Sequence, residues 1–202
     1  MARSGLRLQL FKQQAQAGDI ILLHEDESEA LTHPYLAHLW ARRGRTVRIE
    51  APGQARKRGI LGVREVSSGH LHVVTSATKR SSDFIALLGQ LDQVYGPQSG
   101  RPQQPVVLVL DNGPIHTSKA TTKALLSRPW LQVEWLPKYA PELNEIERDW
   151  RHLKRHHLAN RTFRDVDDLD RSIHEAIDAI NIQRSPRPCI EFQPSAELMR
   201  AA

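Results

Sequence analysis

The chain has 202 residues, of which 40% are hydrophobic and 25% charged, and its formal net charge is +5. This composition is ordinary for a globular protein, and the length suits one domain with a substantial core. The single cysteine, Cys189, excludes an internal disulfide and a cysteine-rich zinc site. No run of about 18 apolar residues and no signal-peptide pattern occur, so a membrane protein is not expected and the cytoplasm is the default location.

The chain divides into three expected parts. Residues 1–18 predict a lead-in or linker segment, helical or loose, without a clear core face. Residues 19–185 predict the folded domain, and residues 186–202 a C-terminal tail.

Strand-like segments dominate the first half of the domain. The apolar run DIILLH at 19–24 predicts a buried strand. TVRIE (46–50), RGILGVREV (58–66) and HLHVVTSA (70–77) predict further strands, joined by turns that contain glycine.

Helices and strands alternate in the second half. Residues 81–96 predict a helix with Ser82 as its N-cap, and a loop rich in Gly and Pro follows. The remaining elements are expected as strand 106–111, helix 117–127, strand 131–136, a helix from near Pro141, and helix 165–183. The core-facing positions expected on the first and last helices are Phe84, Leu87, Leu88, Leu91, Leu169, Ile173, Ala176, Ile177 and Ile180.

Acidic residues follow two of the apolar strands. Asp111 ends the run VVLVLD, and Glu25, Asp26 and Glu27 follow DIILLH. If the two strands are neighbours, Asp26 and Asp111 meet at the sheet edge where ligands collect in open α/β folds. Clustered carboxylates repel one another unless cations neutralise them, and Mg²⁺ prefers oxygen ligands. The pattern predicts a metal-dependent phosphoryl-transfer site.

The helix that begins near Pro141 supplies the third acid. Its buried stripe is expected to be Leu143, Ile146, Trp150 and Leu153. At 100° per residue, Glu147 lies on the edge of this stripe, whereas Glu145 points more nearly to solvent. Glu142 falls in the first turn, where its charge suits the helix dipole. Glu147 is therefore the preferred acid.

Four stretches of the chain resemble the catalytic domain of DDE insertion-sequence transposases of the mariner-related superfamily. They are HEDESEALTHPYLAHLWARRG (24–44), LVLDNGPIHTSKAT (108–121), LPKYAPELNEIERDWRHLK (136–154) and NRTFRDVDDL (160–169). The third is the most specific and the first the weakest. The resemblance extends from about residue 19 to residue 181.

The resemblance implies an α/β, RNase H-like fold with a mixed five-stranded sheet flanked by helices. It implies that Asp26, Asp111 and Glu147 are the catalytic acids and hold two Mg²⁺ ions, about 4 Å apart, which Mn²⁺ can replace. The implied activity is DNA strand cleavage and strand transfer, in which the metal centre activates first water and then a 3′-hydroxyl.

The chain departs from the family pattern at two points. Glu145 stands where the family usually has Pro, and Glu25, Asp26 and Glu27 are consecutive. Strand alternation sets Glu25 and Glu27 on the face opposite Asp26, and the family pattern selects Asp26.

The expected partners are DNA, as transposon ends and target, and a second copy of the chain in a homodimer on DNA. Family members carry helix-turn-helix modules ahead of this domain, and residues 1–18 are too few for one. A separate helix-turn-helix domain or a companion chain is therefore expected. The implied location is the prokaryotic cytoplasm, at the nucleoid when the protein is bound to DNA.

Several other residues have expected roles around the site. Asn112 is expected to hold its turn by backbone hydrogen bonds, His116 to orient a phosphate, bond an acid or cap a helix, and Asn144 to cap a helix or face the site. Basic clusters favour contacts with DNA phosphates. The candidate DNA-binding residues are Arg56, Lys57, Arg58, Lys138, Arg151, Lys154 and Arg155, whereas Trp40, Trp135 and Trp150 are expected in the core.

Three alternatives stay open. A catalytically inactive or domesticated remnant would keep the fold and the basic surface as a DNA-binding module. An RNase H-like nuclease would share the fold and the metals but prefer hybrid or branched substrates. A phosphatase acting on small molecules would need a closed pocket, which the sequence does not indicate.

Overall fold

The fold is built on one mixed sheet, seen in a computed structural model that describes residues 2–51, 53–98, 104–137 and 144–185. The strand order is β3-β2-β1-β4-β5, which confirms the predicted five-stranded sheet. The first three strands are antiparallel, and β4 and β5 run parallel to β1. The strands are β1 (Ile21–Leu31), β2 (Lys57–Glu65), β3 (Leu71–Ser76), β4 (Val106–Leu110) and β5 (Leu131–Trp135).

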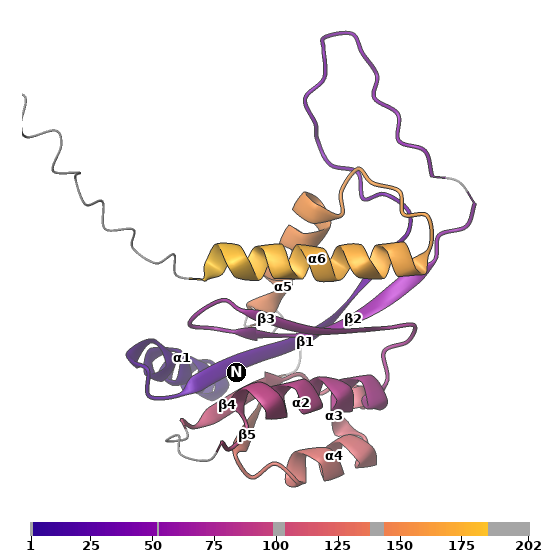
Figure 1. Cartoon of the computed structure of the whole chain (residues 1–202). Helices are drawn as coiled ribbons and strands as arrows, with labels where there is room; N and C mark the ends of the chain where they lie inside the picture. Colours follow the sequence, from indigo (N-terminus) through magenta and orange to yellow (C-terminus); the bar gives the residue numbers. More distant parts are fainter. Residues whose placement is uncertain (1, 52, 99–103, 138–143, 186–202) are drawn as a thin grey trace, which may run out of the picture.

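Helices cover both faces of the sheet (Figure 1). Helices α2, α3 and α4 lie on one face, and α5, the π-helical turn η2 and α6 lie on the other. Their bounds are α1 (Ala2–Ala17), α2 (Ser81–Tyr95), α3 (Pro114–Thr117), α4 (Lys119–Leu126), α5 (Ile146–His152), η2 (Leu153–His157) and α6 (Val166–Arg184). None of the helices described is long and apolar enough to cross a membrane.

The predicted core positions on α2 and α6 are confirmed, because all nine are buried. The expectation for the N-terminal segment is wrong in one respect. Helix α1 does have a core face, since Leu8 and Ala15 pack with Leu22, Val107 and Val109. Only a few positions of α1 carry this face, so little helical periodicity marks it in the sequence.

Strand β1 is longer than the run DIILLH predicts, and Glu25, Asp26 and Glu27 lie inside it. The reason is its pairing. Strand β4 accompanies β1 only as far as His24, whereas β2 accompanies it as far as Leu31. Polar residues can continue a strand where one neighbour still supplies hydrogen bonds.

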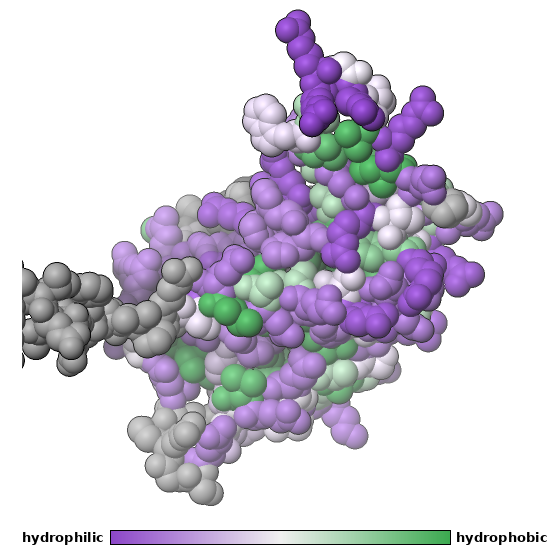
Figure 2. All heavy atoms as spheres, turned by 45° about the horizontal axis from the view of Figure 1, so that its top comes forward, coloured by the Kyte–Doolittle hydropathy of each residue, from purple (hydrophilic) through white to green (hydrophobic). Residues whose placement is uncertain are grey.

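The segment of residues 32–56 projects from the domain between β1 and β2, as Figure 1 shows. The predicted strand TVRIE (46–50) is wrong, because this stretch belongs to the projection and forms no strand. Trp40 is also on the projection and fully exposed, at 101%, so its expected core position is wrong. Hydrophobic side chains appear among hydrophilic ones on this part of the surface in Figure 2.

Smaller differences concern helix and core boundaries. The N-cap of α2 is Arg80 and not Ser82, because the main-chain N–H of Arg80 donates to the Asp83 carboxylate. The helix expected at 117–127 begins at Pro114 and is interrupted at Ser118, giving α3 and α4. Trp150 is buried as expected, but Trp135 is 39% exposed on edge strand β5. Pro141, Glu142 and Leu143 lie outside the described residues.

Candidate active site

The pairing of β1 with β4 joins the two strands that lead to Asp26 and Asp111. His24 is the partner of Val109 in the parallel register. Asp26 and Asp111 each lie two residues beyond this last pair, and Asp111 directly follows β4. The Asp26 carboxylate lies on the α5 side of the sheet, where it meets Trp150, whereas the Asp111 carboxylate turns toward His116.

Asp26 is largely buried and lies near other carboxylates. Its carboxylate accepts a hydrogen bond from the indole N–H of Trp150 at 3.2 Å. Burial raises the pKa of Asp26 to about 6, and the negative charges of Glu27 and Glu147 add to this increase. Carboxylates held together in this way favour binding of a cation.

Gly62 makes room for the indole that reaches Asp26. It is the partner of Asp26 across the β1–β2 pair. A Cβ atom at this position would lie about 2.4 Å from Cη2 of Trp150. This role of Gly62 was not predicted, although a lone glycine inside a strand pattern is a recognised sign of close approach.

Asp111 is held by a different set of contacts. Its Oδ1 accepts hydrogen bonds from the main-chain N–H of Gly113 and from Nδ1 of His116, both at 2.7 Å. On the other side of the His116 ring, Nε2 lies 2.9 Å from Oε2 of Glu25, an ion-pair distance without hydrogen-bond alignment. Both described bonds to Asp111 use Oδ1, so Oδ2 takes no part in them.

His116 therefore bonds an acid, one of the roles expected for it. Its ring is fully buried and stands edge-on to Phe84, with 4.7 Å between ring centroids. Burial lowers the pKa of His116, but Glu25 and Asp111 outweigh this effect and raise it to about 9. The sequence indicated His116 but not Glu25, which strand alternation placed on the opposite face from Asp26.

Helix α5 brings Glu147 close to Asp26. A helix of seven residues is not stable alone, so its place depends on tertiary contacts. The side-chain amide of Asn144 donates to the main-chain oxygen of Glu25 at 2.7 Å, and the carboxylate of Asp149 pairs with Arg64 at 3.0 Å and with Arg184. These contacts fix the first turn of α5 on β1 and β2.

Two neighbouring residues have roles that the structure makes definite. Asn112 donates to the main-chain oxygen of Leu136 at 2.7 Å, which joins the ends of β4 and β5. Glu145 does not point to solvent as expected, because its carboxylate pairs with Lys12 at 2.6 Å and approaches Arg64 at 3.8 Å. Glu145 therefore helps to attach α5 to α1 and β2.

The side chains of the acids are of the type that binds a divalent ion, but they lie too far apart to bind one together. Carboxylate oxygens are the ligands that Mg²⁺ and Mn²⁺ prefer. Among the described residues, however, no group of three or more His, Cys, Asp or Glu side chains is close enough to hold an ion. The donor set fits a metal, and its side chains would have to close around it.

The candidate DNA-binding residues fall in two places. Arg56, Lys57 and Arg58 lie at the base of the projection, where Lys57 approaches Glu29 at 3.7 Å and Arg58 pairs with Asp170 at 2.7 Å. The other group lies on α5 and η2 and consists of Arg151, Lys154 and Arg155. Lys138 is outside the described residues.

Comparison with known proteins identifies the family. The family model described as DDE superfamily endonuclease matches residues 22–170. The chain belongs to this DDE family. It is also 32% identical, over 132 residues, to a protein of insertion element IS630 from Shigella sonnei that is described as an uncharacterized 39 kDa protein. That match covers 65% of this chain and 37% of the relative.

Solved structures share the DDE fold. The Mos1 transposase paired-end complex with the left transposon end has a TM-score of 0.63 at 17% identity, covering 87% of this chain and 52% of that one. The Mos1 mariner paired-end complex with Mn has a TM-score of 0.58 at 15% identity, covering 92% and 61%. A simian T-cell lymphotropic virus intasome in complex with PP2A regulatory subunit B56 gamma has a TM-score of 0.51 at 15% identity, covering 83% and 50%.

These findings confirm the predicted family and the RNase H-like fold of the DDE domain. The family model describes the domain as a DDE superfamily endonuclease. The chain spans less than two thirds of the length of each of these relatives.

Gly62→Ala tests whether the contact between β2 and Trp150 is as close as the geometry indicates. The added methyl group must displace the indole, so we expect a loss of about 1–3 kcal/mol in the free energy of unfolding. Gly89→Ala is the matched control, because the new methyl group meets nothing within 4 Å in α2. It should stabilise the protein by about 0.5–1 kcal/mol. Urea denaturation measures both, and equal effects of the two substitutions would contradict the contact.

His116→Ala tests the buried pair with Glu25. Removing the ring leaves the Glu25 carboxylate buried without a cation, so unfolding free energy should fall by about 3–5 kcal/mol. Adding Glu25→Gln to His116→Ala should recover part of this loss, since the remaining group is neutral. The four proteins form a double-mutant cycle in urea denaturation. Additive effects would show that the two side chains do not interact.

Proposed function

We propose that this domain cleaves DNA strands and joins them to target DNA, with Asp26, Asp111 and Glu147 holding two divalent metal ions. The observation that carries the proposal is the β1–β4 register, whose last pair, His24 and Val109, lies two residues before Asp26 and Asp111, together with the effect of Glu147 on the pKa of Asp26. Membership of the DDE family supports the same three acids. Mg²⁺ is the proposed ion, and Mn²⁺ can replace it.

The bound ions would supply Lewis-acid activation of the attacking oxygen and stabilisation of the leaving oxygen. The residues of the chain orient the ligands. Trp150 holds one oxygen of Asp26, and His116 and Gly113 hold Oδ1 of Asp111, which would leave Oδ2 to bind an ion. Glu147 approaches from α5 and completes the set.

The proposed partners are DNA and a second copy of the chain, with a helix-turn-helix domain or companion chain for recognition of transposon ends. The DNA-bound state of the Mos1 structure named above supports DNA as the substrate class. An insertion element from a bacterium supports action in the cytoplasm, at the nucleoid.

Metal binding is tested without any assay of activity. Millimolar Mn²⁺ should raise the melting temperature of the wild-type protein by a few degrees, because an ion that binds only the folded state stabilises it. Asp26→Asn should be more stable than wild type without metal, since it removes repulsion, and should gain little from Mn²⁺. Asp178→Asn changes an exposed acid on α6 and should respond to Mn²⁺ as wild type does. An equal response of all three proteins would contradict the metal assignment.

Strand cleavage is tested by nicking of supercoiled plasmid in Mn²⁺. Asp111→Asn should lower the rate at least about a hundredfold, because metal activation contributes several kcal/mol and about 1.4 kcal/mol equals a factor of ten. Glu147→Gln should behave alike, whereas Glu145→Gln should retain nicking. Wild-type rates in Asp111→Asn would sink the proposal. A wild-type protein that binds DNA and never nicks it would favour the inactive remnant instead.

A further inference from the structure

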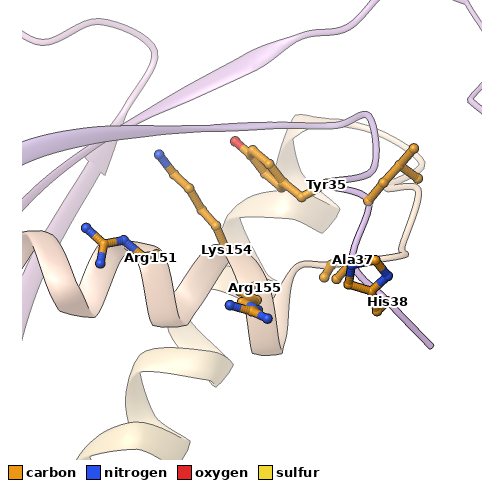
Figure 3. Close-up of a pocket in the computed structure, with 8 residues that line it drawn as sticks. Tyr35, Ala37, His38, Arg151, Lys154 and Arg155 are labelled. Carbon is orange, nitrogen blue, oxygen red and sulfur yellow. The ribbon is translucent and has the colours of Figure 1, made fainter. Parts of the chain in front are cut away.

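A cavity of about 540 Å³ lies beside the candidate active site, between the start of the projection and the helix that carries Glu147. Tyr35, Leu36 and Ala37 line one side, and Arg151, Lys154 and Arg155 line the other (Figure 3). Its volume is in the range of sites that bind small molecules or single ligand groups. The proposed cleavage chemistry and the three acids give this cavity no role.

The wall formed by the projection is fixed by main-chain hydrogen bonds. The side-chain amide of Asn160 donates to the main-chain oxygen of Ala37 and accepts from its N–H, both at 3.0 Å. The N–H of Asn160 also donates to the oxygen of Tyr35 at 2.8 Å. Asn160 has a φ of 57°, a left-handed conformation that asparagine tolerates better than most residues. The cavity is therefore formed before any ligand binds.

The opposite wall carries positive charge. Arg151 and Arg155 are exposed, and the amino group of Lys154 lies 5.9 Å from the centre of the Tyr35 ring. Lys154 and Arg155 lie in the π-helical turn η2, and such turns often occur at functional sites. Among the described residues that line the cavity there is no Asp or Glu. This charge favours an anionic ligand.

The cavity is linked to Asp26, one of the acids proposed to hold the metal ions, because Trp150, which bonds Asp26, lies four residues before Lys154. Lys154 interacts electrostatically with both Asp26 and Glu29. An anion bound between Lys154 and the arginines would therefore be next to the phosphodiester that the acids act on. The apolar and aromatic lining, with Tyr35, Leu36 and Ala37, suits a flat base more than a bare phosphate.

We propose that this cavity binds an unpaired nucleotide of DNA next to the cleaved phosphodiester, with its base against Tyr35 and Leu36 and its phosphates on Arg151, Lys154 and Arg155. The proposal rests on the proposed function for its substrate class. A base inside a duplex must leave the stack at an energetic cost before it can enter a cavity, so a frayed, bulged or single-stranded nucleotide is the preferred ligand.

The consequence is a preference for DNA with unpaired nucleotides. Two oligonucleotides test it by fluorescence anisotropy in EDTA, where no cleavage occurs: a paired duplex, and the same duplex with three unpaired nucleotides that include 2-aminopurine. Wild-type protein should bind the second about tenfold more tightly, as expected for stacking of a base on an aromatic surface. The emission of 2-aminopurine should fall as its base stacks in the cavity.

Ala37→Phe fills the cavity without a change of charge. It should remove the preference and the change in 2-aminopurine emission while altering affinity for the paired duplex by less than about twofold. Ala55→Phe adds the same ring at an exposed position that does not line the cavity, and it should behave as wild type. Thermal melts check that both variants are folded.

The outcomes separate the two claims. Equal wild-type affinity for both DNAs, or equal weakening of both by Ala37→Phe, would overturn the nucleotide site and leave DNA cleavage intact. Absence of binding to either DNA would overturn the proposed function as well. Loss of the preference for DNA with unpaired nucleotides in Ala37→Phe, but not in Ala55→Phe, would support the nucleotide site.

Discussion

The carboxylates of Glu25, Asp26, Glu27 and Asp111 gather around the carboxyl end of β4, where like charges oppose one another. Two buried side chains offset this repulsion from opposite faces of the sheet. The indole of Trp150 bonds Asp26 on the α5 side, and His116 lies between Glu25 and Asp111 on the α2 side. The remaining negative charge is what a divalent cation would neutralise.

The difference in length between β1 and β4 makes this arrangement possible. Strand β4 ends at Leu110, so Asp111 is free of the sheet ladder and can turn toward His116. Strand β1 continues along β2, which keeps Asp26 in a fixed orientation opposite Gly62. One acid is thus held by strand pairing and the other by a turn, and α5 adds Glu147 through its contacts with β1, β2 and α6.

Much of the fold could be predicted because its signals are local. The apolar run VVLVLD and the stripes of α2 and α6 each report burial through periodicity alone. The projection could not be predicted this way, because TVRIE has strand composition but finds no partner strand. The predicted core position of Trp40 was wrong for the same reason, since an apolar pattern does not show whether other residues pack around the side chain.

The types of residue in the candidate site could be predicted from the sequence, but the residues that hold them in place could not. Acids that follow apolar strands indicate a site from the sequence, and so does His116 after Asp111. The roles of Gly62 and Glu25 depend on contacts across strands and between helix and sheet, which no local pattern encodes. Glu145 was misjudged because its partner, Lys12, lies in a segment whose packing was not expected.

An anomalous difference map from a crystal soaked in Mn²⁺ tests the central claim most directly, since it reports where the ion binds without needing a DNA substrate. The account predicts a peak bound by Asp26 and Oδ2 of Asp111, with Glu147 close by and His116 still on Oδ1. A peak elsewhere, or no peak with Asp26 and Asp111 turned apart, would contradict the assignment of these acids.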